Sequence, residues 1–158
     1  KPNSEFEFEI GHWVGKRQFS KPGKFDSCMV SKHNENDELL ILRLDRENTL
    51  SVAVFEKVWK GMVPSRVESS VFVDHNILFL GYGLLYERKA LGMEISNTPT
   101  SIAMIASGKM LSINVVGQSV VFDLENAKGA LSYLQYCFRT AGSATFSQVA
   151  DLPDNPSR

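Results

Sequence analysis

The fold is decided by residues 110–140, MLSINVVGQSVVFDLENAKGALSYLQYCFRT. Halfway through this stretch, the spacing of the apolar residues changes from that of a strand to that of a helix. The first half alternates apolar and polar side chains, and this predicts two strands joined by a turn at Gly117 and Gln118. The second half has apolar residues at helical spacing and predicts a closing helix packed across a sheet, capped by Asp123 or Asn126. The apolar stripe of this helix consists of Ala127, Ala130, Leu131, Leu134, Cys137 and Phe138.

Upstream of this stretch, short strand-like segments separated by polar turns dominate the chain, and 5–10 and 66–74 alternate apolar and polar residues. They predict strands at 5–10, 25–32, 39–44, 49–57, 66–74 and 91–96. The run ILFLGYGLLY, residues 77–86, is apolar at nearly every position and predicts one or two buried strands. Within it, the glycines of GYG indicate a bulge or a close approach of the backbone to another group.

Residues 98–109 interrupt the strands with a helical pattern of about two turns. Thr98 is suited to cap such a helix and Pro99 suits its first position. We expect Gly108 to take a left-handed conformation where the helix ends.

These segments predict a mainly β fold, an antiparallel β-sandwich or open barrel with one short helix and a C-terminal helix packed on it. No long alternation of strands and helices is present, so a doubly wound parallel sheet is excluded. At 158 residues the chain can bury a sizeable core. We expect residues 1–150 to form a single β-rich domain and residues 151–158 to be a loose tail or linker.

Composition excludes several classes of function. Seventeen basic and eighteen acidic residues give a net charge of −1 and are scattered, so neither nucleic acid nor an anionic membrane is indicated as a partner. No apolar run reaches the roughly 18 residues of a membrane span. No metal or cofactor motif is present in the sequence, and the spacing of histidines and cysteines does not suit zinc. The first residue is lysine rather than methionine, so it need not be the natural start.

Four aromatic residues are candidates for a binding surface: Trp13, Trp59, Tyr82 and Tyr86. Each combines a large apolar ring with a polar atom, which suits a groove, although such residues also close the edges of a β-sandwich. The only adjacent pair that suggests catalysis is Asp74 and His75, which an enzyme could use in a cleft.

The two cysteines admit two interpretations. Cys137 lies on the apolar stripe near a helix C-terminus, where the helix dipole disfavours a thiolate, so it is a poor nucleophile. In a cytosolic protein Cys28 and Cys137 would be two buried thiols, and in an exported protein they would form one disulfide. Such a link would close a loop of about a hundred residues and stabilise the fold by on the order of 4–5 kcal/mol.

An early tryptophan and cysteine, Trp13 and Cys28, are followed by hairpins and a strand ending in Val73 and Asp74. The last third of the chain carries the clearest pattern, at Gly108, Leu111, Ile113, Phe122, Leu124, Ala130, Leu131, Leu134 and Cys137. These features resemble small exported proteins of Gram-negative, chiefly alphaproteobacterial, origin, of the invasion-associated locus B type. The resemblance implies a periplasmic or surface-exposed, β-rich module without catalytic residues. In that compartment we predict that Cys28 and Cys137 are paired.

The leading hypothesis is therefore a non-enzymatic exported module, periplasmic or extracellular, that binds a protein or an envelope component. A second hypothesis is a carrier that holds a small apolar ligand between Tyr82, Tyr86 and the helix at 130–138. A third is an enzyme that uses Asp74 and His75. The sequence leaves the oligomeric state and the identity of the partner open.

Overall fold

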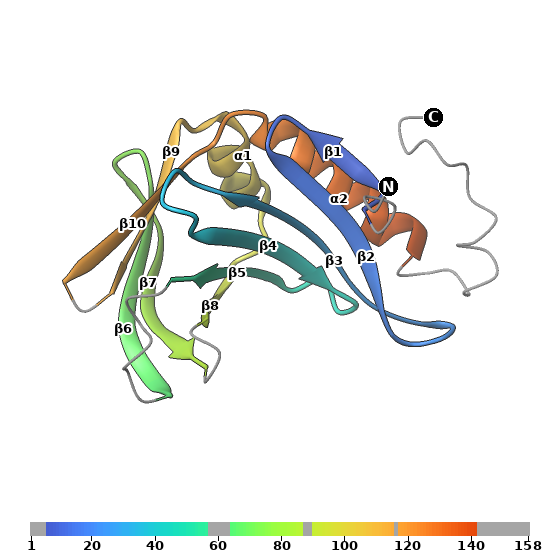
Figure 1. Ribbon diagram of the computed structural model, residues 1–158, viewed down its shortest axis with the longest axis horizontal. Helices are drawn as coiled ribbons and strands as arrows, with labels where there is room; N and C mark the ends of the chain where they lie inside the picture. Colours follow the sequence, from blue (N-terminus) through green and yellow to red (C-terminus); the bar gives the residue numbers. More distant parts are fainter. Residues whose placement is uncertain (1–5, 57–63, 87–89, 116, 142–158) are drawn as a thin grey trace.

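The computed structural model describes residues 6–56, 64–86, 90–115 and 117–141, which form one ten-stranded antiparallel sheet and two helices (Figure 1). This confirms the predicted mainly β fold with a C-terminal helix. The strands are β1 (Phe8–Ile10), β2 (Trp13–Lys21), β3 (Lys24–His33), β4 (Leu39–Asp45), β5 (Leu50–Phe55), β6 (Ser65–Val73), β7 (Asn76–Leu85), β8 (Ala90–Ile95), β9 (Met110–Val115) and β10 (Gln118–Asp123). The helices are α1 (Pro99–Ser107) and α2 (Ala127–Ala141).

The sheet is strongly curved and remains open. Its strand order is β1-β2-β3-β4-β5-β8-β7-β6-β9-β10, so β10 is an edge strand (Figure 1). Side chains, rather than a backbone ladder, hold β10 to the other half of the sheet. Asn34 Nδ2 donates to the carbonyl oxygen of Val121 at 2.9 Å, and Lys32 Nζ donates to the carbonyl oxygen of Asp123 at 2.9 Å. The structure is therefore the open barrel of the two predicted alternatives.

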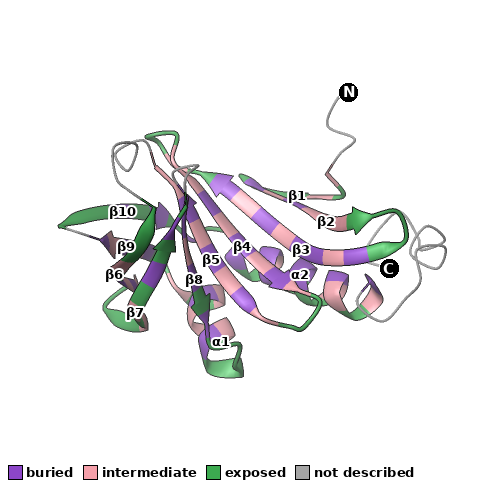
Figure 2. Ribbon diagram, turned by 90° about the horizontal axis from the view of Figure 1, so that it is seen from below, coloured by how far each residue is buried: buried purple, intermediate pink, exposed green. Residues whose placement is uncertain are grey.

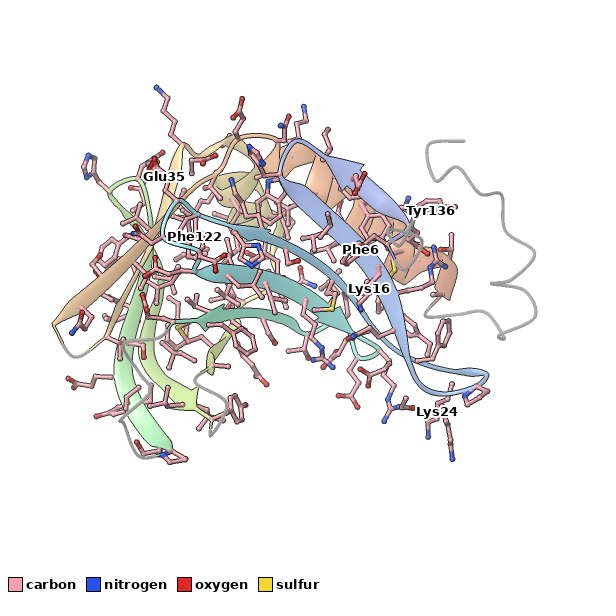
Figure 3. All side chains as sticks on the ribbon, in the orientation of Figure 1. Phe6, Lys16, Lys24, Glu35, Phe122 and Tyr136 are labelled. Atoms are coloured by element: carbon pink, nitrogen blue, oxygen red, sulfur yellow. A yellow bond between two sulfur atoms is a disulfide. The ribbon has the colours of Figure 1, made fainter. Side chains whose placement is uncertain are left out.

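The inner face of the curve carries the core. Val30, Leu42, Val52 and Met93 are direct neighbours on four successive strands, and each is at most 3% exposed. Burying such a side chain contributes roughly 1.5–3 kcal/mol. Figure 2 shows the resulting alternation of buried and intermediate residues along β3, β4 and β5. Phe122 of β10 belongs to the same core and is fully buried (Figure 3).

Helix α2 covers β2, β3 and β4 on this inner face (Figures 1 and 2). The disulfide between Cys28 of β3 and Cys137 of α2 fixes this contact, with the two Cα atoms 6.1 Å apart and neither residue exposed. Leu131 and Leu134 of the predicted stripe are also buried, whereas Phe138 is only partly buried. This disulfide is the pairing of Cys28 with Cys137 that we predicted for an exported protein.

The N-terminal strands pack against α2 through Tyr133. Its ring stacks on Phe8 with centroids 4.7 Å apart and lies directly over Gly15, where a Cβ atom would come within 2.8 Å of the ring. Its hydroxyl donates to Glu7 Oε1 at 2.7 Å, and Arg17 holds the same carboxylate at 2.8 Å. Position 15 therefore requires glycine, because a Cβ atom there would collide with the Tyr133 ring.

Helix α1 begins as predicted and ends differently. The hydroxyl of Thr98 accepts from the backbone N–H of Ser101 at 3.1 Å, and Pro99 occupies the first turn. Gly108 has a φ of −77°, so the predicted left-handed exit is wrong. Glycine is required there for space instead, because a Cβ atom would overlap Val73 Cγ1 and lie 2.8 Å from the carbonyl oxygen of Met104.

Three further sequence expectations need correction. Residues 13–21, for which no separate strand was predicted, form the nine-residue strand β2. Val115 pairs with Gln118, so the β9–β10 turn lies one residue earlier than predicted. Asp123 does not cap α2, because its carboxylate accepts from the backbone N–H of Glu125 and from Lys32. Asn126 directly precedes the helix with a φ of +67°.

Candidate functional site

The four aromatic candidates do not form one surface. Trp13 is fully buried, its Nε1 donates to the carbonyl oxygen of Glu125 at 2.9 Å, and Lys32 Nζ lies 5.5 Å from its ring centroid. It is therefore a core residue, because its indole N–H finds a backbone acceptor inside the fold. Trp59 lies outside the described residues. Tyr82 and Tyr86 are 55% and 54% exposed.

Tyr82 and Tyr86 belong to a row of exposed apolar side chains on one face of β7. The strand alternates, so that Gly83 and Leu85 face the core while the intervening residues face outward. We call the exposed row the β7 stripe: Ile77 (54% exposed), Leu80 (72%), Tyr82, Leu84 (45%) and Tyr86. The prediction that the run 77–86 is buried is therefore wrong for one of its two faces.

Gly83 of β7 is required for space on the inner side of the strand. A Cβ atom on Gly83 would lie 2.9 Å from Ser69 Oγ and 3.0 Å from Leu91 Cδ1. The strand thus approaches its neighbours closely on the inner side, as the predicted close approach of the backbone requires. The larger side chains of Leu80 and Tyr82 are confined to the outer side.

Polar and charged groups border the β7 stripe on the side of β6. The guanidinium carbon of Arg66 lies 5.0 Å from the ring centroid of Tyr82, and Glu68 is the direct cross-strand neighbour of Tyr82. A hollow of about 550 Å³ adjoins the stripe, lined among others by Leu80, Ser70 and Asn114. An apolar row beside a polar hollow can bind a partner and fix its orientation.

Asp74 and His75 lie in the turn between β6 and β7, where the carboxylate of Asp74 has a structural role. It accepts from the backbone N–H groups of Lys109 and Met110 at 3.2 and 3.0 Å. The backbone N–H of Asp74 in turn donates to the carbonyl oxygen of Met110 at 2.8 Å. These bonds tie the turn to the start of β9, and Asp74 itself has a positive φ of +57°.

The carrier hypothesis needs a different cavity from the one predicted. Tyr82 and Tyr86 lie on the outer face of the sheet, whereas α2 covers the inner face, so they do not share a cavity. A separate pocket of about 370 Å³ lies between α1, α2 and the β4–β5 hairpin. It is lined by the apolar residues Leu44, Leu50, Ile102, Leu131, Leu134 and Phe138 and by polar residues at its rim.

Among the residues that the structure describes, two ionisable groups have clearly shifted pKa values, and neither belongs to the β7 stripe. Burial, together with the hydrogen bond to Glu7, raises the pKa of Tyr133 far above its ordinary value. The hydrogen bond from Lys32 holds the pKa of Asp123 below its ordinary value, against the opposing effect of partial burial. Lys32 is only 3% exposed, so this contact satisfies a buried charge and stabilises the fold.

Within the described residues, no group of three or more histidine, cysteine, aspartate or glutamate side chains is placed to hold a metal ion. The same part of the chain has no helix long and apolar enough to cross a bilayer. At the N-terminal end, Lys16 Nζ lies 5.7 Å from the ring centroid of Phe6, which is a cation–π contact (Figure 3).

Comparison with known proteins shows a similarity of fold to a solved structure. The structure is similar to the crystal structure of invasion associated protein B from Bartonella henselae, with a TM-score of 0.61. The match covers 84% of this chain and 96% of that chain at 13% sequence identity, which shows the fold alone. No family profile and no curated protein matches the sequence. The resemblance inferred from the sequence is thus supported for the fold.

Proposed function

We propose that this chain is a non-enzymatic, exported, β-rich module that binds a protein or an envelope component through the β7 stripe. The observation that carries the proposal is the exposure of Leu80, Tyr82, Leu84 and Tyr86 in one continuous row. Single exposed apolar residues are ordinary, whereas a contiguous patch bordered by polar groups is typical of an interaction site.

The composition of the stripe suits recognition of a partner. Tyr82 and Tyr86 supply large contact areas at low cost in side-chain entropy, and their hydroxyls can remain hydrated or bond to the partner. Arg66, which lies over the Tyr82 ring, adds a planar donor beside the apolar row. Tyrosine and arginine are the residue types that most often dominate binding energy in interfaces.

Export is supported by the buried disulfide between Cys28 and Cys137. Disulfides persist in oxidising compartments and are rare in the cytosol. The protein of similar fold is described as invasion associated, which is compatible with a module in the periplasm or at the cell surface.

The proposal can be tested by site-specific photo-crosslinking in the source cell. A photoreactive amino acid at position 80 is expected to give a discrete adduct, and the same amino acid at exposed Ser132 of α2 is the control. The adduct partner, once identified and purified, should bind the unmodified chain at least tenfold more tightly than the Tyr82→Ser variant. Equal adducts at positions 80 and 132, or equal affinity for both chains, would count against the β7 stripe.

The pocket between α1 and α2 supports a second candidate function, a carrier of a small apolar molecule. Its volume of about 370 Å³ lies at the lower end of the range of small-molecule sites. Gln135→Trp, at the rim, should block binding of a fluorescent apolar probe, whereas Ser132→Trp on the same helix should not. Unchanged probe fluorescence with both variants would remove this candidate.

A further inference from the structure

Strand β7 is an edge strand over most of its length. It pairs with β6 from end to end, but its ladder with β8 consists of only two pairs, Leu84 with Gly92 and Leu85 with Leu91. If that ladder continued, Tyr82 would face Glu94. Instead the pairing stops, and residues 76–83 of β7 have no strand partner on this side among the described residues.

A hydrogen bond near the connection between β7 and β8 shows in which direction the unpaired backbone groups of β7 point. The N–H of Tyr86 donates to the carbonyl oxygen of Ala90 at 2.9 Å, so even-numbered residues of β7 direct N–H and C=O toward β8. Leu80 and Tyr82 are even-numbered and lie beyond the last pair. Their backbone groups therefore point away from β6 and have no hydrogen-bond partner within the described part of the chain.

The free edge has little of the protection that edge strands ordinarily carry. Native edges are blunted by lysine, proline, charged inward-facing residues or shortness. Strand β7 is ten residues long and contains neither proline nor any charged residue. Its one irregularity, the register shift opposite Val71 and Phe72, lies near its start and leaves Leu80 and Tyr82 in regular register.

We propose that this edge accepts an extended peptide segment of another protein, which adds as a strand beside Leu80 and Tyr82. The inference rests on the proposed function and names the form of its partner. Both residues would then offer a backbone donor and acceptor to the incoming chain and an apolar side chain on the same face. Main-chain hydrogen bonds would supply affinity, and contacts with the β7 stripe would favour a peptide in which every second side chain is apolar.

Charge further specifies the incoming segment. Glu94 of β8 is exposed on the outer face at the position that would face Tyr82, and β7 itself is uncharged. An added strand beside β7 would therefore carry its outward side chains between the β7 stripe and Glu94. A lysine or arginine alternating with apolar residues on that face would pair with the Glu94 carboxylate.

The first test measures amide exchange by NMR with a defined probe, a blocked nine-residue peptide. One face of the peptide alternates valine and lysine, and the other face carries threonine. In the free protein the N–H groups of Leu80 and Tyr82 are expected to exchange quickly, and Gly81 and Gly83, which pair with β6, slowly. The peptide should slow exchange at Leu80 and Tyr82 by at least tenfold. The same peptide with glutamate in place of lysine should bind several-fold more weakly.

The second test uses proline, which removes an edge N–H without touching the β6 ladder. Leu80→Pro should fold and should weaken binding of the peptide at least tenfold. Ser119→Pro is the matched control on β10, where the carbonyl oxygen of Val121 bonds to Asn34, so odd-numbered residues point away from β9. This variant should bind the peptide as the unmodified chain does.

The outcomes separate this inference from the proposed function. The peptide could shift the NMR signals of the side chains of the β7 stripe while the backbone N–H groups of Leu80 and Tyr82 still exchange quickly. In that case strand addition is wrong, and binding through the exposed side chains of the stripe alone remains. No binding at millimolar peptide, or protection of both amides in the free monomer, also overturns strand addition. Concentration-dependent protection without peptide would assign the edge to a second copy of this chain and would overturn a foreign partner. The crosslinking experiment above tests the proposed function independently.

Discussion

The disulfide between Cys28 and Cys137 leads to a quantitative prediction about stability. The two cysteines are 109 positions apart, so the bond closes most of the chain into one loop. In the chain-entropy model, a loop of about 110 residues removes about 16 cal/mol/K from the unfolded ensemble. At 25 °C this corresponds to about 4.8 kcal/mol in favour of the folded state. A domain is typically stable by about 5–15 kcal/mol, so reduction should remove a third of the stability or more.

Equilibrium unfolding in urea can measure this difference. Both sulfurs are buried, so the bond has to be reduced in denaturant before the protein is refolded with reductant present. With a urea dependence of about 2 kcal/mol per molar, a loss of 4.8 kcal/mol lowers the midpoint by roughly 2.4 M. Circular dichroism of the sheet and tyrosine fluorescence near α2 should report the same transition if unfolding is two-state.

The matched control is the double variant Cys28→Ala/Cys137→Ala, which should have a low urea midpoint that reductant does not change. In the reduced protein α2 should lose protection from amide exchange before β4 and β5, because the bond ties that helix to β3. A difference of less than about 1 kcal/mol between oxidised and reduced protein would refute the reasoning. Two free thiols in protein isolated from its natural source would refute the assignment to an oxidising compartment.

Three further predictions concern single side chains of the fold. Lys32 holds the pKa of Asp123 below its usual value, so Asp123→Asn should be less stable at pH 7. The difference should begin to shrink as the pH falls below about 4 and should be lost below the lowered pKa of Asp123; a difference independent of pH in thermal melts would contradict this. Burial and Glu7 raise the pKa of Tyr133, so its neutral form stabilises the fold below about pH 10, and above that pH the unmodified chain should lose stability faster than Tyr133→Phe does. If both melting curves fall in parallel above pH 10, the tyrosine is not responsible. Gly108→Ala should cost about 1–3 kcal/mol in chemical denaturation because the methyl group overlaps its neighbours, and a cost below 0.5 kcal/mol would show that the site can relax.

Local features of the fold were predictable because their causes are local. Alternation of apolar and polar residues marked β6 and β9, since a strand with one buried face repeats every two residues. Thr98 and Pro99 marked the start of α1, because capping depends on a side chain reaching the next turn. The helical spacing of Ala130, Leu131, Leu134 and Cys137 predicted the buried face of α2.

Features set by contacts distant in sequence were not predictable in this way. Trp13 suggested a groove, but it is buried in the core, where its N–H bonds to a carbonyl group 112 positions away. Gly108 suggested a left-handed turn, but its small size is needed against Val73, which comes from another strand. The sequence has no local signal for either contact.

The β7 stripe shows most clearly which features the sequence predicts and which ones depend on the tertiary structure. The apolar run 77–86 indicated a strand, and two of its residues, Tyr82 and Tyr86, were candidates for a binding surface from the sequence alone. Which edge of this strand is unpaired depends on strand order, because β6 pairs with β7 along its whole length while β8 pairs with it at only two positions. The sequence determines that β7 is apolar on both sides. Only the tertiary structure decides that Gly83 and Leu85 face the core while Leu80, Tyr82 and Leu84 are exposed, and that the edge of β7 toward β8 is unpaired beyond Leu84, because both depend on contacts with strands distant in sequence.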